Sequence, residues 1–297
     1  MPIRLMENFR AVFYAPYYAT YALGFYGREG VQVELLTSDA PGDAVPKLLD
    51  GGIDLTWGGP MRVMKAHDQD RHSPLISFCE VVSHDPFFLI GRSSGRPFRL
   101  TDLAQMKFAS VSEVPTPWMC LQQDLRDAGI DPDKLPRFSD RAMTRNYHAL
   151  QAGDLEVMQA FEPFASMAEQ DGAGEVLYAA SSRGPTSYTA FIATRDACEK
   201  YREEFAAMTR ATAKMLQWVY SRPAEDLAAG VTTFFPDVPK ELLAHSLRRY
   251  RDAGLWSRET RMIPQGFARL GQSFVSGGSL ARPPHYDECV ELILNDI

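Results

Sequence analysis

Strand-like and helix-like patterns of apolar residues alternate along most of this chain. Short apolar runs predict buried strands, and apolar residues that recur at three- and four-residue steps predict amphipathic helices. We predict strands at residues 3–8, 31–36, 75–82, 87–91, 107–111, 176–179 and 188–193. We predict helices from residue 13 towards 27 and at residues 42–49, 61–70, 118–127, 205–220, 224–231, 241–251 and 286–295. This alternation is typical of an α/β protein with mixed, mostly parallel sheets covered on both faces.

Two segments, one in each half of the chain, repeat the same pattern. Residues 48–60 and 150–163 each run from the end of a helix through glycine and a short strand to a proline that begins another helix. Glycine adopts positive φ at little cost, and proline suits the first turn of a helix. The repeat predicts two α/β lobes. Since ligands bind outside the carboxyl ends of strands in open α/β sheets, function is expected near residues 57–59 and 161–162.

The two predicted lobes need two crossing points. Residues 92–97 are polar, contain glycine and proline and show no periodicity, so they predict the first crossing. The second is expected around residues 194–197. We therefore predict that residues 1–92 and 196–297 form lobe I and that residues 93–195 form lobe II.

Composition excludes several classes of protein. The net charge of −7 argues against nucleic-acid binding, and no apolar run is long enough to span a membrane. The cysteines form no C-x-x-C pair, and no histidine stands at metal-ligand spacing, so no metal, cofactor or disulfide framework is expected. Met1 and Pro2 directly precede a predicted strand without a leader-like segment, which favours a cytoplasmic location. A periplasmic location is expected instead if a leader was removed.

Several segments resemble one known superfamily. Residues 15–19 (APYYA) and 24–33 (GFYGREGVQV) are similar to segments of type II periplasmic-binding-protein-like chains, including the run G-Y/F-F-x-x-E-G-[IL]-x-V. The two G-x-[IVY]-D steps of that superfamily resemble residues 52–54 and 153–156. The resemblance is to the nitrate/sulfonate/taurine group and its thiamine-pyrimidine synthase-like branch. It covers nearly the whole chain, becomes weaker after about residue 235, and implies a two-lobed fold with a ligand cleft between the lobes.

The chain also departs from that branch. The eukaryotic pyrimidine synthase consumes an active-site histidine that would fall on or beside Arg62, and it carries a cysteine-rich loop that would fall near residues 183–188. Neither feature is present here. The resemblance therefore does not imply that enzyme activity.

Candidate ligand-binding residues of the first half follow predicted strands. Asn8 ends the first strand, and Phe13 and Tyr17 belong to an aromatic cluster that stacks on a flat ligand or fills the core. Gly58 and Gly59 precede a helix start that favours an anion, and Arg62 either contacts an anion or lies on the solvated helix face. His84 lies in a turn between two strands, where it either bonds the ligand or acts as an acid–base group, or else is a capping or exposed residue.

The second half contributes a smaller set. Glu162 precedes a predicted helix, where its carboxylate either binds an amino-bearing group or caps the helix at the surface. Thr116 and Trp118 lie at the start of the helix that follows strand 107–111. We expect Thr116 to donate a hydrogen bond to an anion and the Trp118 ring to stack on the ligand. Tyr188, after a Gly-Pro turn, is the last candidate.

Two functions are compatible with these residues. The first is a solute-binding protein that closes two lobes on a small polar or heteroaromatic ligand. In one alternative, this ligand also carries an anionic group. If exported, it would serve the membrane subunit of an ABC importer. The second is a cytoplasmic enzyme on the same fold, such as a pyrimidine-forming enzyme, decarboxylase or desulfinase. Because no nucleophile–base pattern is recognisable, the sequence favours binding and indicates no catalytic residue.

Overall fold

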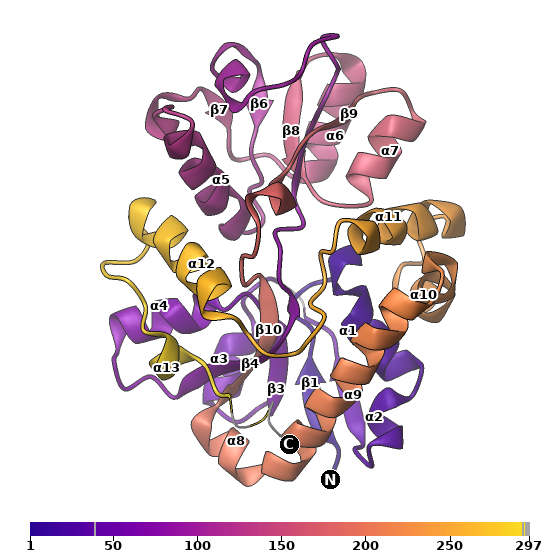
Figure 1. Ribbon diagram of the computed structural model, residues 1–297, viewed down its shortest axis with the longest axis vertical. Helices are drawn as coiled ribbons and strands as arrows, with labels where there is room; N and C mark the ends of the chain where they lie inside the picture. The colour runs from indigo at the N-terminus through magenta and orange to yellow at the C-terminus, as the bar shows by residue number, and fades with distance from the viewer. Residues whose placement is uncertain (39, 293, 295–297) are drawn as a thin grey trace. The chain divides into compact units, whose positions relative to one another are not determined.

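The computed structural model describes residues 1–38, 40–292 and 294. The chain divides into two units (Figure 1). The first unit consists of Met1–His84 and Pro185–Ile297, and the second unit consists of Asp85–Gly184. The chain thus leaves the first unit once and returns to it once.

The first unit is built on a five-stranded sheet. Its strands, in spatial order, are β2 (Val33–Leu36), β1 (Ile3–Met6), β3 (Leu55–Gly58), β10 (Thr189–Thr194) and β4 (Leu75–Val82). Strand β1 pairs in parallel with β2 and β3, whereas β10 is antiparallel to both β3 and β4. Four strands therefore point one way and β10 points the other.

The sheet of the second unit follows the same plan. Its order is β7 (Arg137–Phe138), β6 (Phe108–Ala109), β8 (Val157–Ala160), β5 (Phe88–Gly91) and β9 (Glu175–Ala179). Strand β6 pairs in parallel with β7 and β8, and β5 is antiparallel to β8 and β9. The repeated sequence segments supply β3 and β8, which occupy the same central position in the two sheets.

Helices surround each sheet (Figure 1). Those of the first unit are α1 (Ala15–Ala22), α2 (Phe25–Arg28), α3 (Ala44–Leu49), α4 (Met61–Gln69), α8 (Arg195–Lys200), α9 (Arg202–Ser221), α10 (Ala224–Val231), α11 (Lys240–Asp252), α12 (Pro264–Ser276) and α13 (Tyr286–Cys289). Those of the second unit are α5 (Thr116–Asp127), α6 (Met143–Ala152) and α7 (Phe164–Gln170). Short 3₁₀ helices lie at Val12–Tyr14, Leu100–Gln105, Pro132–Lys134, Ala180–Arg183 and Thr232–Phe234.

Aromatic packing fills the core of the first unit. The Tyr17 ring on α1 stacks on Trp57 of β3, with centroids 4.8 Å apart and planes 5° apart. Phe191 of β10 contacts Tyr17 and Phe78, and Phe78 stacks on Phe205 of α9. These rings bridge the sheet and its helices, which fixes where α1 and α9 lie.

The core of the second unit is smaller. Trp118 of α5 packs against Phe108 of β6 in a cluster completed by leucines and Val157. Arg137 also packs on the Trp118 ring, with its guanidinium carbon 4.0 Å from the ring centroid.

The predicted crossing points differ from the observed ones. Strand β5, which we predicted as part of lobe I, pairs with β8 and β9 in the second sheet. Strand β10, predicted as part of lobe II, pairs with β3 and β4 in the first sheet. The division falls after His84 and Gly184, before each of these strands. Loop composition placed the crossings too late because strand pairing decides which sheet a segment joins.

The last predicted helix is also different. Helix α13 ends at Cys289, and Val290 forms a parallel bridge with Ser77 of β4. Residues 293 and 295 of the prediction lie outside the described part of the chain. Helix α12 was not predicted.

We expect Gly153→Ala to lower the free energy of unfolding by about 1 kcal/mol, because the left-handed conformation is strained for a residue with a Cβ atom. Gly153 ends α6 with φ of +83°. The control is Gly27→Ala inside α2, where φ is not positive and a Cβ atom has nothing within 4 Å. Urea unfolding curves measure both. Equal stability of the two variants would contradict the role given to Gly153.

Candidate ligand-binding site

The carboxyl-end edge of the first sheet brings together residues from separate parts of the chain. Asn8 follows β1, Gly58 ends β3 and His84 follows β4. Because β10 is antiparallel, its first end lies at the same edge, where the Tyr188 N–H donates to the Val82 carbonyl at 2.9 Å. The structure thus places these predicted residues on one edge of one unit.

Arg62 lies at the centre of this edge. It is the second residue of α4, and its Nη2 donates to Asn8 Oδ1 at 3.1 Å. A Cβ atom at Gly58 would lie 3.7 Å from Arg62 Nε, and one at Gly42 would lie 3.1 Å from Nη1. The guanidinium therefore lies close to two glycines whose missing side chains leave room for it.

Among the described residues, the charge of Arg62 has no acidic partner. Within the described part of the chain, the neutral amide of Asn8 is the hydrogen-bond partner of its side chain, and no carboxylate forms an ion pair with it. Burial lowers the pKa of Arg62, but an arginine side chain stays protonated in proteins. The result is a partly buried positive charge, with N–H donors that no described residue accepts.

Aromatic side chains pack beside this charge. Asn8 Nδ2 donates to the Tyr14 hydroxyl at 3.4 Å. Phe13 contacts Tyr188 edge to face at 6.2 Å, and a Cβ atom at Gly59 would lie 3.5 Å from the Tyr188 carbonyl oxygen. The Phe13 and Tyr188 rings are both buried. Tyr17 is different, because its stack on Trp57 makes it a core residue of this unit.

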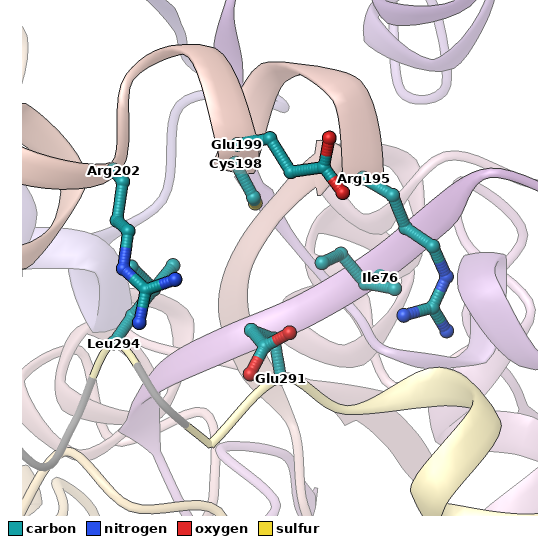
Figure 2. Close-up of a pocket in the computed structure, with 7 residues that line it drawn as sticks. All are labelled: Ile76, Arg195, Cys198, Glu199, Arg202, Glu291 and Leu294. Atoms are coloured by element: carbon teal, nitrogen blue, oxygen red, sulfur yellow. The ribbon is translucent and has the colours of Figure 1, made fainter.

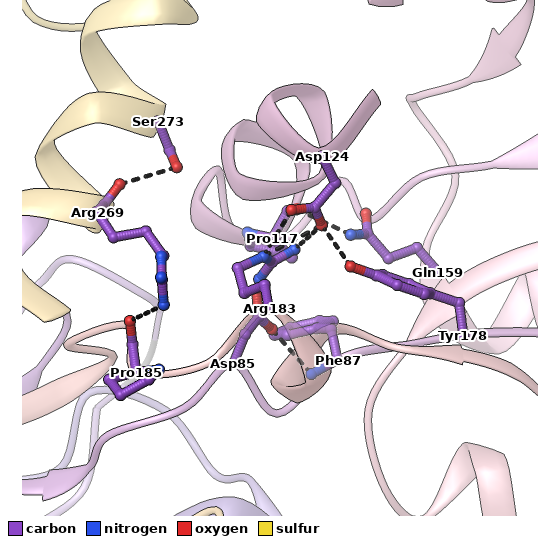
Figure 3. Close-up of polar contacts among 10 residues, drawn as sticks. All are labelled: Asp85, Phe87, Pro117, Asp124, Gln159, Tyr178, Arg183, Pro185, Arg269 and Ser273. Carbon is purple, nitrogen blue, oxygen red and sulfur yellow. Dashed lines mark hydrogen bonds and ion pairs between the residues drawn. The ribbon is translucent and has the colours of Figure 1, made fainter. Parts of the chain in front are cut away.

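His84 is partly buried at the end of β4. Its Nδ1 lies 3.2 Å from the Ser83 hydroxyl. Burial lowers the pKa of His84, and the positive charge of Arg269 lowers it further. Arg269 of α12 is held by its Nη1, which donates to the Pro185 carbonyl at 2.7 Å (Figure 3). At neutral pH the imidazole is therefore uncharged and adds no positive charge to this edge.

The carboxyl-end edge of the second sheet holds the other predicted residues. Thr116 begins α5, and the next residue, Pro117, accepts a hydrogen bond from Gln159 Nε2 of β8 at 2.9 Å. Glu162 follows β8 and is fully buried. Its oxygens accept from the Ser166 backbone N–H at 3.0 Å and from the Ser166 hydroxyl at 2.8 Å.

These contacts give the three predicted residues of the second unit different structural roles. Glu162 caps the start of α7 from inside the protein and not at the surface. Trp118 is a core residue, because Phe108 and Arg137 pack against it. Thr116 keeps the position at a helix start that the sequence predicted. A ligand role for these three residues stays a prediction.

A buried ion-pair cluster of the second unit was missed by the sequence analysis (Figure 3). Arg183 Nη1 contacts Asp85 Oδ2 at 2.5 Å, and its Nε donates to Asp124 Oδ1 at 2.9 Å. The Tyr178 hydroxyl donates to Asp124 at 2.9 Å, and the Phe87 N–H donates to Asp85 at 2.9 Å. Asp85 is the first residue of the unit and Arg183 is next to its last, so the cluster joins the two ends of this unit.

Glu80 of β4 was missed as well. It is 2% exposed, and its Oε1 has no hydrogen-bond partner among the described residues. Burial raises the pKa of Glu80 to about 8, and the nearby Ser187 hydroxyl opposes this only in part. The preceding residue, Cys79, has φ of +53° at an irregular point of the β4–β10 pairing. A charged residue inside the apolar run 75–82 was the available signal.

A small cavity lies at the opposite edge of the first sheet (Figure 2). Its volume is about 90 Å³, and its lining residues are Ile76, Arg195, Cys198, Glu199, Arg202, Glu291 and Leu294. Burial raises the pKa of Cys198 to about 12, so this cysteine remains a thiol. None of the residues predicted to bind a ligand lines this cavity.

Neither metal ligands nor a membrane span were found in the described residues. No group of three or more histidine, cysteine, aspartate or glutamate side chains is arranged to hold a metal ion there. No helix in residues 1–38, 40–292 and 294 is long and apolar enough to cross a membrane.

The fold and the comparisons with known proteins agree. Two α/β units of the same strand plan, linked by two crossings, define the periplasmic-binding-protein fold. The family described as NMT1/THI5 like matches residues 12–226, and the chain belongs to this family. A Bacillus subtilis (strain 168) protein named as a binding protein, YtlA, is 26% identical over 292 residues, with 97% of this chain and 87% of that protein covered.

Solved structures of binding proteins share the fold at low identity. The aliphatic sulphonate binding protein SsuA of Escherichia coli has a TM-score of 0.77 and 16% identity, with all of both chains covered. The nitrate-binding protein NrtA of Synechocystis PCC 6803 has a TM-score of 0.68 and 15% identity over 99% of this chain and 86% of that chain. The predicted superfamily and fold class are confirmed.

Glu80 leads to a prediction about pH and stability. Because its pKa in the folded protein is about 8, compared with an ordinary value of 4.5, the folded state binds an additional proton between these pH values. The free energy of unfolding should therefore fall as pH rises through this window, by at most about 1.4 kcal/mol per pH unit. Urea unfolding at several pH values measures the slope.

Two variants separate the effect of Glu80 from that of other groups. Glu80→Gln should remove this component of the slope, whereas Glu34→Gln, at an exposed position of β2, should keep the wild-type slope. Identical slopes in wild type and Glu80→Gln would show that Glu80 does not titrate in this window.

Removing the arginine of the buried cluster should destabilise the second unit. Arg183→Gln leaves Asp85 and Asp124 without their cation, which typically costs about 3–5 kcal/mol for a buried pair. Arg96→Gln is the control, because Arg96 pairs with Asp102 with 60% of its side chain exposed. The control should cost much less, because solvent screens an exposed ion pair. Comparable losses in thermal unfolding experiments would contradict the structural role of Arg183.

Proposed function

We propose that this protein is the solute-binding component of an ABC-type import system and that its ligand carries a compact anionic group. The observation that carries the proposal is the partly buried Arg62 at the carboxyl-end edge of the first sheet. Its side chain has a neutral hydrogen-bond partner and no carboxylate among the described residues. A desolvated cation of this kind is stabilised by a ligand that supplies the missing negative charge.

The geometry around Arg62 supports an oxyanion as this group. A guanidinium presents parallel N–H donors that match a carboxylate, sulfonate or phosphate. Gly58 and Gly59 precede α4, and the first N–H groups of a helix also favour negative charge. The neutral state of His84 leaves Arg62 as the main source of positive charge among the predicted residues of this edge.

The relatives support the same class of ligand. SsuA of Escherichia coli is named for aliphatic sulphonates and NrtA of Synechocystis PCC 6803 for nitrate, and both ligands are anions. A Staphylococcus aureus protein with a TM-score of 0.76 and 16% identity is described as the ligand binding component of an ABC-type import system. These names support import as the process, while the anion preference of this chain rests on Arg62.

Arg62→Gln should weaken the binding of an anionic solute at least tenfold, which corresponds to about 1.4 kcal/mol. The reason is that glutamine keeps a polar side chain and removes the charge and the guanidinium fork. A thermal-shift screen of wild type with ethanesulfonate, nitrate, inorganic phosphate and a carboxylated pyrimidine selects the probe. Isothermal titration calorimetry then compares wild type, Arg62→Gln and the exposed control Arg71→Gln.

The outcomes are distinct. The control should bind as wild type does, and Arg62→Lys should bind with intermediate affinity because it keeps the charge without the fork. Wild-type affinity in Arg62→Gln would remove Arg62 from the site. If no anion of the screen binds wild type, the proposed ligand class is wrong.

A further inference from the structure

We propose that Asn8 sets the charge preference of the site, because it holds the Arg62 guanidinium in place without neutralising it. This inference rests on the proposed function and adds a specificity-determining residue to it. Asn8 is buried, with 4% of its surface exposed, two residues beyond the end of β1. Asn8 therefore lies just beyond the strand end with its side chain enclosed by the protein.

The two neighbours of Asn8 determine which way its amide faces. Arg62 Nη2 lies 3.1 Å from Oδ1, and the Tyr14 hydroxyl lies 3.4 Å from Nδ2. A guanidinium has donors only, so the amide oxygen faces Arg62. The amide nitrogen then faces the phenol oxygen, which accepts from it. Asn8 thus connects Arg62 to Tyr14 through two hydrogen bonds and contributes no net charge.

The phenol is also neutral. Burial raises the pKa of Tyr14 to about 12, so the hydroxyl keeps its proton at physiological pH. The path from Arg62 through Asn8 to Tyr14 therefore contains one positive charge and no negative charge. An anionic ligand group completes this arrangement, whereas a neutral or cationic group leaves the guanidinium without a counter-charge.

Other arginines of the chain are neutralised by carboxylates. Arg4 pairs with Asp54 at 2.8 Å, and Arg10 pairs with Glu7 at 2.7 Å. Arg183, nearly buried like Asn8, contacts two aspartates. Glu7 directly precedes Asn8 in the sequence and has its carboxylate turned to Arg10 and Tyr18. The chain therefore places an acid, Glu7, beside Arg10 and a neutral amide, Asn8, beside Arg62.

The decisive substitution is Asn8→Asp, which keeps the shape of the side chain and adds one negative charge. The new carboxylate would form an internal ion pair with Arg62 and compete with the ligand. We expect the affinity for ethanesulfonate, or for the best anion of the screen, to fall at least tenfold without a decrease in the unfolding temperature. Isothermal titration calorimetry and differential scanning fluorimetry measure the two quantities.

Two further variants keep the inference testable if Asn8→Asp does not fold. Asn8→Thr preserves neutrality and should retain the preference for ethanesulfonate over its neutral isostere ethanesulfonamide. Tyr14→Phe removes the acceptor that orients the amide and should lower anion affinity a few-fold with little change in that preference. Asn146→Asp, at a buried asparagine of the second unit, controls for the general effect of a new buried charge.

The outcomes separate this inference from the proposed function. If Arg62→Gln loses anion binding while Asn8→Asp binds as wild type, the function stands and the role of Asn8 is wrong. The role is also wrong if Asn8→Asp weakens ethanesulfonate and ethanesulfonamide binding equally, or if Asn8→Thr loses the preference between them. If wild type binds no anion, both proposals fail.

Discussion

The architecture depends on one antiparallel strand in each sheet. Strand β5 enters the second sheet directly after the first crossing, and β10 enters the first sheet directly after the second crossing. Each lies between two strands of opposite direction and satisfies their backbone groups on both sides. Both units therefore require the chain to cross twice. The Arg183 contacts with Asp85 and Asp124 stabilise the second unit at the ends where these crossings begin.

The charge partners of the structural arginines differ from those of Arg62, the arginine that we propose binds the ligand. Arg183 and Arg10 meet carboxylates, so their charges are compensated inside the protein. Arg62 meets an amide at 3.1 Å and has no carboxylate partner among the described residues, which is why we propose it as the ligand-binding arginine. Burial makes this difference important, because an unpaired charge costs more free energy away from water than at the surface.

Local sequence patterns predicted the elements well and their sheet membership poorly. The glycine and proline positions in residues 48–60 and 150–163 predicted β3, β8 and the helices around them, because these residues act through their own φ angles. The same reasoning misplaced both crossings, since β5 and β10 are assigned by partners distant in the chain. The sequence also left open whether Phe13 and Tyr17 bind a ligand or fill the core. The stack of Tyr17 on Trp57 makes Tyr17 a core residue, whereas Phe13 contacts Tyr188 edge to face.

The sequence by itself determined the α/β class, the two-unit plan and the candidate positions after strands, because hydrophobic period and backbone preference are local properties. Only the tertiary structure decided the roles of the polar side chains. It paired Arg183 with two aspartates, and it buried Glu80 without a hydrogen-bond partner for Oε1 among the described residues. It brought the Glu162 carboxylate into hydrogen-bond contact with the Ser166 hydroxyl. It also placed Asn8 beside Arg62, 54 positions away in the chain. The charge of a site depends on such distant pairs, and no local pattern contains them.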